Sequence, residues 1–336
     1  MTMPQTAIPN PIVLQRADPC VLLHDSQYYF TGSHPAYDRI VLRRASSLAD
    51  LQAADEVTVW THPESGPQSG LIWAPEIHRV GDAWYIYYAA APRVAPDVER
   101  ADDNSHRVYV LECTDADPLT GTWIERGQVN TGWETFALDA TSYVRDGVQY
   151  LIWAQIDHAI PGNSNLYIAR MENPWTLATP AVLLTKPEYD WETVRFAVNE
   201  GPSVLDKGGK LYLTYSASGT GPEYAMGVLV ADRSSDLLDP TSWTKAPAPV
   251  FVSDPTAHQY GPGHNSFTRT VDGEVVLVFH SRTYTKISGD PLFDPNRQAC
   301  AQILPFDANG NPVWGTPVAN TRPVPTSTDV LAPHGM

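Results

Sequence analysis

Cysteine is scarce in this chain of 336 residues, and its scarcity excludes two classes of protein. The three cysteines are Cys20, Cys113 and Cys300. Because their number is odd and no two have a paired spacing, they form neither a disulfide framework nor a zinc motif. Cys20 lies two residues from Asp18, but no partner pattern of His and Asn accompanies it. We therefore interpret Cys20 as a small buried side chain and not as a nucleophile.

Basic residues are also few, since 22 Lys and Arg face 38 Asp and Glu and give a formal net charge of −16. A surface of this charge repels nucleic acid and anionic membranes, so we expect neither as a partner, whereas neutral carbohydrate fits. No apolar run reaches the length of a membrane span. Met1 to Arg16 lacks the basic and apolar regions of a signal peptide, which makes a cytoplasmic protein the default expectation. A secreted protein whose signal has been removed would look the same.

Motifs for cofactors and for several common reactions are missing. The sequence contains no P-loop, no Gly-x-Gly-x-x-Gly fingerprint, no His-Glu-x-x-His, no Gly-x-Ser-x-Gly and no EF-hand loop. We therefore expect chemistry that needs no bound cofactor.

A repeat is present instead. Five segments each combine a short motif, a brief strand, a polar turn and a strongly aromatic or aliphatic strand. We call one polar residue in each motif its anchor, and successive anchors are 58, 63, 61 and 64 residues apart. The anchors are Asp18, Glu76, Asp139, Glu200 and His264. The intervening turns are rich in Asp and Gly, as β-hairpins require.

Each repeat continues with a third alternating strand and ends near a tryptophan, while helical periodicity is not sustained anywhere. Four strands repeated radially describe the blade of a β-propeller. We predict an all-β, five-bladed propeller with four-stranded antiparallel blades as a single domain over residues 1–336, with an irregular tail from about residue 322. The competing prediction is a β-sandwich with coincidental spacing.

The anchors are candidates for chemistry because the first strand of every propeller blade lines the central channel. Four carboxylates and one histidine would converge there, and the repulsion between like charges costs free energy, which suggests a functional site. Cleavage of a glycosidic bond uses one protonated carboxyl group as acid and one ionised carboxylate to activate water. A third carboxylate nearby raises the pKa of the acid.

These motifs, taken together and in order, resemble glycoside hydrolase family 43 over nearly the whole chain. The motifs are Arg16-Ala-Asp18-Pro, Trp73-Ala-Pro-Glu76, Phe136-Ala-Leu-Asp139-Ala-Thr, Asn199-Glu200-Gly-Pro and Tyr260-Gly-Pro-Gly-His264-Asn-Ser-Phe267. Gly289-Asp-Pro-Leu-Phe-Asp-Pro-Asn-Arg297 further resembles the branch of exo-acting α-L-arabinofuranosidases. One departure follows it, because Gln298-Ala299-Cys300 stands where relatives often have His-Thr-Arg. If the missing Arg contacts substrate or the pocket, specificity has drifted.

The resemblance implies a role for each of three carboxylates. Asp18 matches the general base, Asp139 the carboxylate that tunes the acid and orients substrate, and Glu200 the general acid. It also implies inversion of the anomeric configuration, for which the base and the acid lie roughly 6.5–9.5 Å apart. The expected activity is release of L-arabinose from arabinan or arabino-oligosaccharides, without a cofactor in the chemistry.

Three further residues are candidates for binding the sugar. Trp73 resembles an aromatic residue of a family subsite, and we predict that it stacks on the furanose ring. Phe196 is either a second stacking residue or part of the core. Glu76 either contacts the sugar or bonds backbone amides at the blade entrance, and we favour the supporting role.

The remaining candidates lie near the predicted channel. Arg282 is a candidate for binding a sugar hydroxyl or for pairing with Asp139, with a surface position as the alternative. His34 and Asp38 are expected at the pocket rim. His264 resembles a histidine that lies below the active site near an ion or a water. A calcium or other structural ion there would need oxygen ligands from carbonyls and waters, and the alternative is a hydrogen-bonded core histidine.

Other functions remain open on the same scaffold. A β-D-xylosidase or an endo-α-1,5-arabinanase would differ from the leading prediction in its loops only. A non-catalytic carbohydrate-binding propeller is disfavoured, because binding alone does not require an acid and a base. A retaining fructosidase would carry Asn-Asp-Pro and Arg-Asp-Pro motifs, and neither is present.

Overall fold

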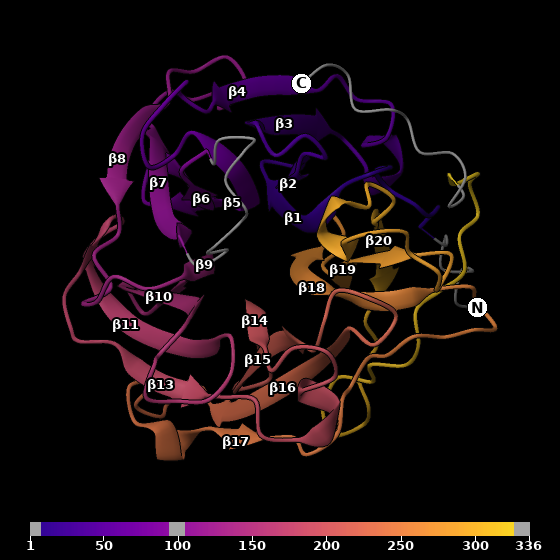
Figure 1. The fold of residues 1–336 in the computed structure, drawn as a ribbon. Coiled ribbons are helices and arrows are strands. Elements are labelled where there is room, and N and C mark those ends of the chain that lie inside the picture. The colour runs from indigo at the N-terminus through magenta and orange to yellow at the C-terminus, as the bar shows by residue number, and fades with distance from the viewer. Residues whose placement is uncertain (1–7, 94–104, 326–336) are drawn as a thin grey trace.

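The computed structural model describes residues 8–93 and 105–325, and their strands form five antiparallel sheets around a common axis (Figure 1). The first blade contains β1 (Ala17–His24), β2 (Gln27–Ser33), β3 (Arg39–Ala45) and β4 (Val57–Thr61). The second contains β5 (Gly70–Val80), β6 (Ala83–Ala91), β7 (Arg107–Cys113) and β8 (Ile124–Gln128). The third contains β9 (Ala137–Arg145), β10 (Val148–Gln155), β11 (Asn165–Asn173), β12 (Thr176–Leu177) and β13 (Val182–Thr185). The prediction of a five-bladed propeller is confirmed.

The last two blades complete the ring. The fourth contains β14 (Asn199–Lys207), β15 (Lys210–Ala217), β16 (Ala225–Asp232) and β17 (Thr244–Lys245). The fifth contains β18 (Tyr260–Arg269), β19 (Val275–Arg282) and β20 (Gln298–Ile303). Short 3₁₀ helices occupy Leu48–Asp50, Asp190–Glu192, Pro240–Ser242 and Pro291–Phe293. Among the described residues, no helix has the length and apolar character needed to cross a membrane.

The number of strands differs from the predicted four in two blades. In the third blade, both β12 and β13 pair with β11, and in the fifth blade the described strands number three. A segment from the beginning of the chain completes the fifth blade. Ile12 N donates to Ala299 O at 2.8 Å, and Ala299 N donates to Val13 O at 2.9 Å. This segment therefore runs along β20 and closes the ring, a long-range pairing that the repeat pattern does not contain.

The core consists of five clusters of buried side chains, which lie mainly between neighbouring blades. Between the first and second blades, for example, Tyr29 packs on Trp84 at 4.8 Å between ring centroids. Cys20, Cys113 and Cys300 are free and buried in these clusters, as expected for Cys20. Each large apolar side chain that is fully buried contributes about 1.5–3 kcal/mol, so the contacts between blades hold the channel rigid. The predicted irregular tail lies largely beyond the described residues.

Every inner strand carries a β-bulge at the same place, with its first residue in the left-handed region. These residues are Asp18 (φ 54°), Ala74 (45°), Asp139 (54°), Gly201 (54°) and His264 (44°). The equivalent positions in the second and fourth blades are therefore Ala74 and Gly201, not the expected Glu76 and Glu200. The pattern of polar side chains misses this because a bulge is a backbone feature. A bulge re-aims its side chain, and the left-handed conformation costs a non-glycine residue about 1–2 kcal/mol.

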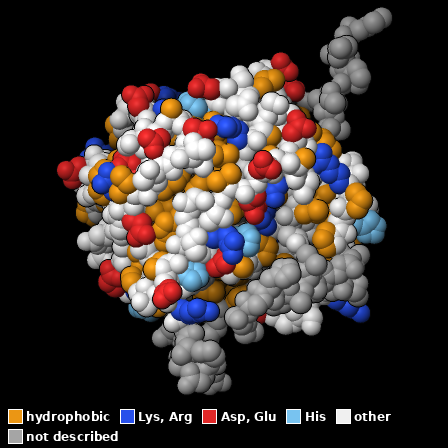
Figure 2. Space-filling view, turned by 90° about the horizontal axis from the view of Figure 1, so that it is seen from above, with side chains coloured by type: hydrophobic (Ala, Val, Ile, Leu, Met, Phe, Trp, Pro, Cys, Tyr) orange, Lys and Arg blue, Asp and Glu red, His pale blue; other side chains and the backbone are white. Residues whose placement is uncertain are grey.

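Charged side chains are scattered over the surface. Figure 2 shows Asp and Glu dispersed over the face in view, with Lys and Arg between them. On this face, the acidic side chains therefore do not form one continuous patch.

Candidate active site

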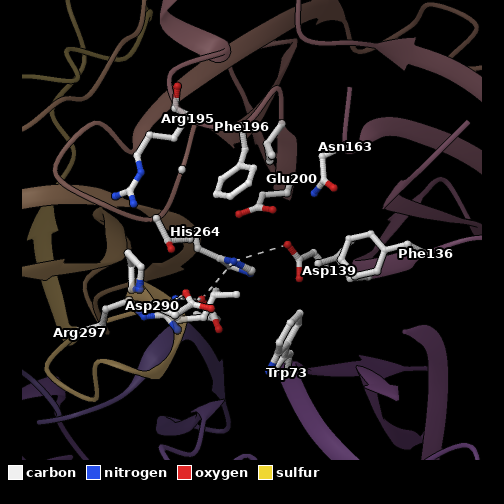
Figure 3. Close-up of a pocket in the computed structure, with 18 of the residues that line it drawn as sticks. Trp73, Phe136, Asp139, Asn163, Arg195, Phe196, Glu200, His264, Asp290 and Arg297 are labelled. Carbon is white, nitrogen blue, oxygen red and sulfur yellow. Dashed lines mark hydrogen bonds and ion pairs between the residues drawn. The ribbon is translucent and has the colours of Figure 1, made fainter. Parts of the chain in front are cut away.

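A cavity of about 300 Å³ lies at the end of the channel where the inner strands begin. Its size is at the small end of the range for ligand pockets. The residues that line it come from all five blades and their loops: Asp18, Tyr37, Trp73, Phe136, Leu138, Asp139, Asn163, Arg195, Phe196, Val198, Glu200, Ser218, Gly219, Thr220, His264, Gly289, Asp290, Pro291, Leu292 and Arg297. Figure 3 shows Asp139, Glu200 and His264 directed into it, with Trp73 on one side and Phe196 with Arg195 across from it.

Asp18 is a buried carboxylate surrounded by positive or polar groups. Its Oδ1 lies 3.3 Å from His264 Nδ1 and 3.4 Å from Arg297 Nη1, and its Oδ2 accepts a hydrogen bond from Ser33 Oγ. Burial by itself raises the pKa of Asp18, but His264 and then Arg297 hold that pKa far below its usual value. Asp18 is therefore ionised at neutral pH.

Asp139 and Glu200 differ from Asp18 in that their pKa values are raised. Gly201 N donates to Asp139 Oδ2 at 3.1 Å, and Tyr224 donates from its hydroxyl to Glu200 Oε1 at 2.7 Å. Burial, followed by repulsion from Glu200 and Asp18, raises the pKa of Asp139 well above its usual value. Burial also raises the pKa of Glu200, to about 7, although the bond from Tyr224 lowers it in part. Asp139 thus retains a proton at neutral pH and Glu200 titrates near neutral pH, while Asp18 remains charged, which is how one site supplies both an acid and a base.

His264 lies between two of the carboxylates. Its Nδ1 is 3.3 Å from Asp18 Oδ1 and 3.7 Å from Asp139 Oδ2, and its backbone N donates to Ser216 Oγ at 2.7 Å. Within the described residues, no group of three or more His, Cys, Asp or Glu side chains is arranged to hold a metal ion. An ion beside His264 would therefore depend on backbone carbonyls and water for most of its ligands.

The arginine that reaches the acidic cluster is Arg297 and not Arg282. Arg297 contacts Asp18 and donates from Nη2 to Tyr37 Oη at 2.8 Å. Arg282 is 2 % exposed and lies behind the pocket wall, where it donates to Thr220 O at 2.7 Å and Pro291 O at 2.6 Å. Pairing with Asp139 was one of two roles predicted for Arg282, and hydrogen bonds that hold two wall loops take its place; the alternative of a surface position is wrong, because the side chain is buried. The reason is position, because Arg282 ends β19 whereas Arg297 immediately precedes β20 and lines the cavity.

Both predicted aromatic residues line the cavity, but they differ in exposure. Trp73 is 8 % exposed and stacks on His106, with ring centroids 3.8 Å apart and planes 20° apart. Phe196 is 60 % exposed and lies at the rim, free to meet a ligand. Sequence reasoning missed Tyr37, which contacts the Trp73 ring edge to face at 6.0 Å. Its place between two candidates, His34 and Asp38, was the available signal.

Three other candidates do not line the cavity. Glu76 is buried and meets His78, with Oε2 and Nε2 2.9 Å apart, so its partner is a side chain and not the expected backbone amides. His34 Nδ1 lies 3.6 Å from Asp38 Oδ1. Asp38 accepts two hydrogen bonds from Arg39, at 2.7 and 2.6 Å, and so stabilises the turn that carries Tyr37.

The departure at Gln298-Ala299-Cys300 lies in β20, outside the cavity lining. Gln298 accepts from Gln15 N at 2.8 Å, and Ala299 and Cys300 are fully buried in the core. These three residues serve the packing and closure of the fifth blade.

Comparison with known proteins gives consistent matches. The family model described as "Glycosyl hydrolases family 43" matches residues 8–312. A Streptomyces chartreusis protein named "Extracellular exo-alpha-(1->5)-L-arabinofuranosidase" is 50% identical over 284 residues, which are 84% of each chain. A Streptomyces avermitilis protein of the same name is 48% identical over 94% of this chain, and here the match spans 65% of the relative's length. The crystal structure of an α-L-arabinofuranosidase from Lactobacillus brevis superimposes with a TM-score of 0.90 and 50% identity, covering 94% of this chain and 98% of that one.

Proposed function

This chain belongs to glycosyl hydrolase family 43, and from that membership we propose that it is an inverting exo-α-L-arabinofuranosidase. It would release L-arabinose from the ends of arabinan or arabino-oligosaccharides. The observation that carries the proposal is the single cavity in which ionised Asp18 faces the proton-retaining pair of Asp139 and Glu200. The names of relatives that are about half identical support arabinose as the sugar.

The proposed roles follow from the charge states. Glu200 gives its proton to the glycosidic oxygen as the bond from that oxygen to the anomeric carbon breaks. Asp18 takes a proton from a water whose oxygen bonds to the anomeric carbon from the opposite face. Asp139 and Glu200 each disfavour ionisation of the other, so that when one of them is charged the other keeps its proton. Glu200 ends ionised and Asp18 protonated, and exchange with solvent restores both.

Exo action and the location of the enzyme outside the cell are part of the same proposal. A cavity of about 300 Å³ suits the end of a sugar chain better than its middle, which supports exo action. Two relatives are named extracellular, so we propose action outside the cell in place of the cytoplasmic expectation. A structural ion beside His264 stays a proposal, for which a lower melting temperature in EDTA, reversed by calcium, is the test.

The deciding experiment is product analysis on linear α-1,5-arabino-oligosaccharides, with xylo-oligosaccharides in parallel. Release of arabinose one unit at a time is the expected result, and NMR of the first product should show inverted configuration. Release of larger fragments would indicate an endo-arabinanase, and release of xylose a β-xylosidase. Binding without any product, measured by calorimetry, would favour the carbohydrate-binding propeller and overturn the proposal.

A further inference from the structure

Tyr224, immediately before β16, is a fully buried tyrosine whose hydroxyl donates to Glu200 Oε1 at 2.7 Å. It does not line the cavity and belongs to none of the motifs above. We propose that Tyr224 is a positioning residue for the acid, which fixes one oxygen of Glu200 so that the other faces the glycosidic bond. This inference rests on the role of Glu200 in the proposed function.

A notch of glycines receives the Tyr224 ring. A Cβ on Gly263 would lie 2.5 Å from Tyr224 Cε1, and a Cβ on Gly261 would lie 3.6 Å from Tyr224 Cβ and 2.3 Å from Gly221 O. Gly261 also has a φ of +62°, where a side chain is strained. The space that this ring occupies therefore explains Gly263, whereas the left-handed backbone and the close approach of Gly221 O explain Gly261.

The Tyr224 ring also links Glu200, the proposed acid, to Asp18, the proposed base. Tyr224 stacks on His280 with planes 5° apart and centroids 5.6 Å apart. His280 Nδ1 in turn accepts a hydrogen bond from Asp18 N at 3.1 Å. Burial lowers the pKa of His280 to about 3, so its ring is neutral and its Nδ1 is free to accept. A rigid stack thus joins the backbone of Asp18 to the carboxyl group of Glu200.

The hydrogen bond also suits the proton transfer. With Oε1 engaged by Tyr224, the acidic proton of Glu200 belongs on Oε2, from which it passes to the leaving oxygen. The bond from Tyr224 becomes charge-assisted as Glu200 ionises, so it is stronger after proton transfer than before. Burial, with repulsion from Glu200, raises the pKa of Tyr224 well above its usual value and keeps it a donor.

The test compares Tyr224→Phe with Tyr215→Phe. Tyr215 is an equally buried tyrosine of the same blade, and its hydroxyl donates to Glu192 Oε1 at 2.8 Å, away from the cavity. For Tyr224→Phe, we expect kcat on arabino-oligosaccharides to fall about tenfold or more, with a smaller fall on an aryl glycoside whose leaving group needs no proton. The alkaline limb of its kcat/KM profile should move to higher pH by about one pH unit, because the ionised acid has lost a donor. Tyr215→Phe should change neither kcat nor the alkaline limb, because its partner Glu192 supports the loop of Phe196, and any effect through that loop should appear in KM.

The outcomes separate this inference from the proposed function. The pH limb and the leaving-group dependence are compared on whichever glycoside the wild type cleaves, so a different sugar specificity leaves the test intact. An unmoved alkaline limb with unchanged kcat in folded Tyr224→Phe would overturn the inference, and so would equal shifts in both variants. If Tyr224→Phe does not fold, Gly263→Ala, which crowds the ring, replaces it with the same expected direction.

Discussion

Glu192 and Glu200 lie eight residues apart in the chain, and their pKa values shift in opposite directions although desolvation raises both. Glu192 is fully buried and accepts hydrogen bonds from Glu188 N, Tyr189 N, Asn199 Nδ2, Tyr215 Oη and Lys245 Nζ. Burial alone would raise its pKa, but these donors lower it below the usual value. Glu200 accepts from Tyr224, and its pKa rises to about 7. The comparison shows that burial raises the pKa of both carboxyl groups, and that donors and counter-charges overcome this effect for Glu192 but not for Glu200.

The two residues also serve different parts of the site. Val198 N donates to Glu192 O at 3.2 Å, so the Glu192 network holds both ends of the loop that presents Arg195 and Phe196 to the cavity. Glu200 follows this loop directly and opens β14. A satisfied carboxylate thus supports the loop, and an incompletely satisfied one beside it performs the proposed chemistry.

Of the substitutions proposed, Glu200→Gln should produce the largest effect, and this effect should be on activity. Without a proton to give, kcat on arabino-oligosaccharides should fall by about 10³-fold or more, while an aryl glycoside with an activated leaving group should lose much less. Because Gln resembles the protonated acid in shape and does not ionise, the free energy of unfolding should match wild type below pH 4.5 and be higher than wild type at neutral pH. Steady-state kinetics and urea unfolding measure the two effects.

Asp18→Asn is the control for that experiment. It should lose activity on both kinds of substrate, because water still needs a base when the leaving group needs no acid. Wild-type activity of Glu200→Gln on arabino-oligosaccharides would show that the acid is another residue.

Glu192→Gln should lower the stability of the protein and leave the proposed acid in place. It leaves the Lys245 ammonium, whose side chain is 10% exposed, without its buried partner, and the expected loss is about 3 kcal/mol in the free energy of unfolding. Activity per folded molecule should change mainly in KM, through the loop. Unfolding of Glu192→Gln, Lys245→Met and the double variant measures the coupling, and additive losses would refute a buried ion pair.

The fold was predictable because it repeats. Anchor spacings and turn residues recur five times, so errors in any one strand do not alter the number of blades. The closure of the ring by Ile12 and Val13 was not predictable, because it joins residues nearly 290 positions apart and uses no motif. The bulges at Ala74 and Gly201 were not predicted for another reason, because the polarity of a side chain does not indicate the backbone conformation at that residue.

The convergence of Asp18, Asp139 and His264 followed from their equivalent places in the repeat, and Glu200 joins them from the position directly before the bulge residue Gly201. Residues outside the inner strands lacked such a guide. Arg282 and Arg297 both lie near the end of the fifth blade, and only side-chain direction separates the loop-holding residue from the one at the cavity. Tyr224 is one of 16 tyrosines, and nothing local distinguishes it from a core residue.

The contributions of Glu200 and Glu192 to stability should change with pH in opposite directions. Glu200 has a folded pKa of about 7, above its ordinary 4.5, so its contribution is complete below pH 4.5 and is lost as pH rises through 7. Relative to Glu200→Gln, the wild type should lose about 3 kcal/mol of unfolding free energy from pH 4.5 to 7.5. Glu192 has a lowered pKa, so its contribution is present at neutral pH and is lost on acidification. Urea unfolding of the three proteins at several pH values tests this, and parallel curves would contradict it.

Phe196→Ala should give the smallest effect, and it tests the binding role of the loop without removing the Glu192 network that supports the loop. Phe196 is 60 % exposed, so its removal should leave the free energy of unfolding within about 0.5 kcal/mol of wild type. Loss of an aromatic contact worth about 1 kcal/mol should raise KM for arabino-oligosaccharides about fivefold, with kcat unchanged. Val271→Ala is a matched control, because Val271 is 63 % exposed and does not line the cavity. Michaelis–Menten kinetics on arabinotriose then decides whether the loop held by Glu192 binds the substrate: a KM equal to that of Val271→Ala would make Phe196 a bystander at the rim.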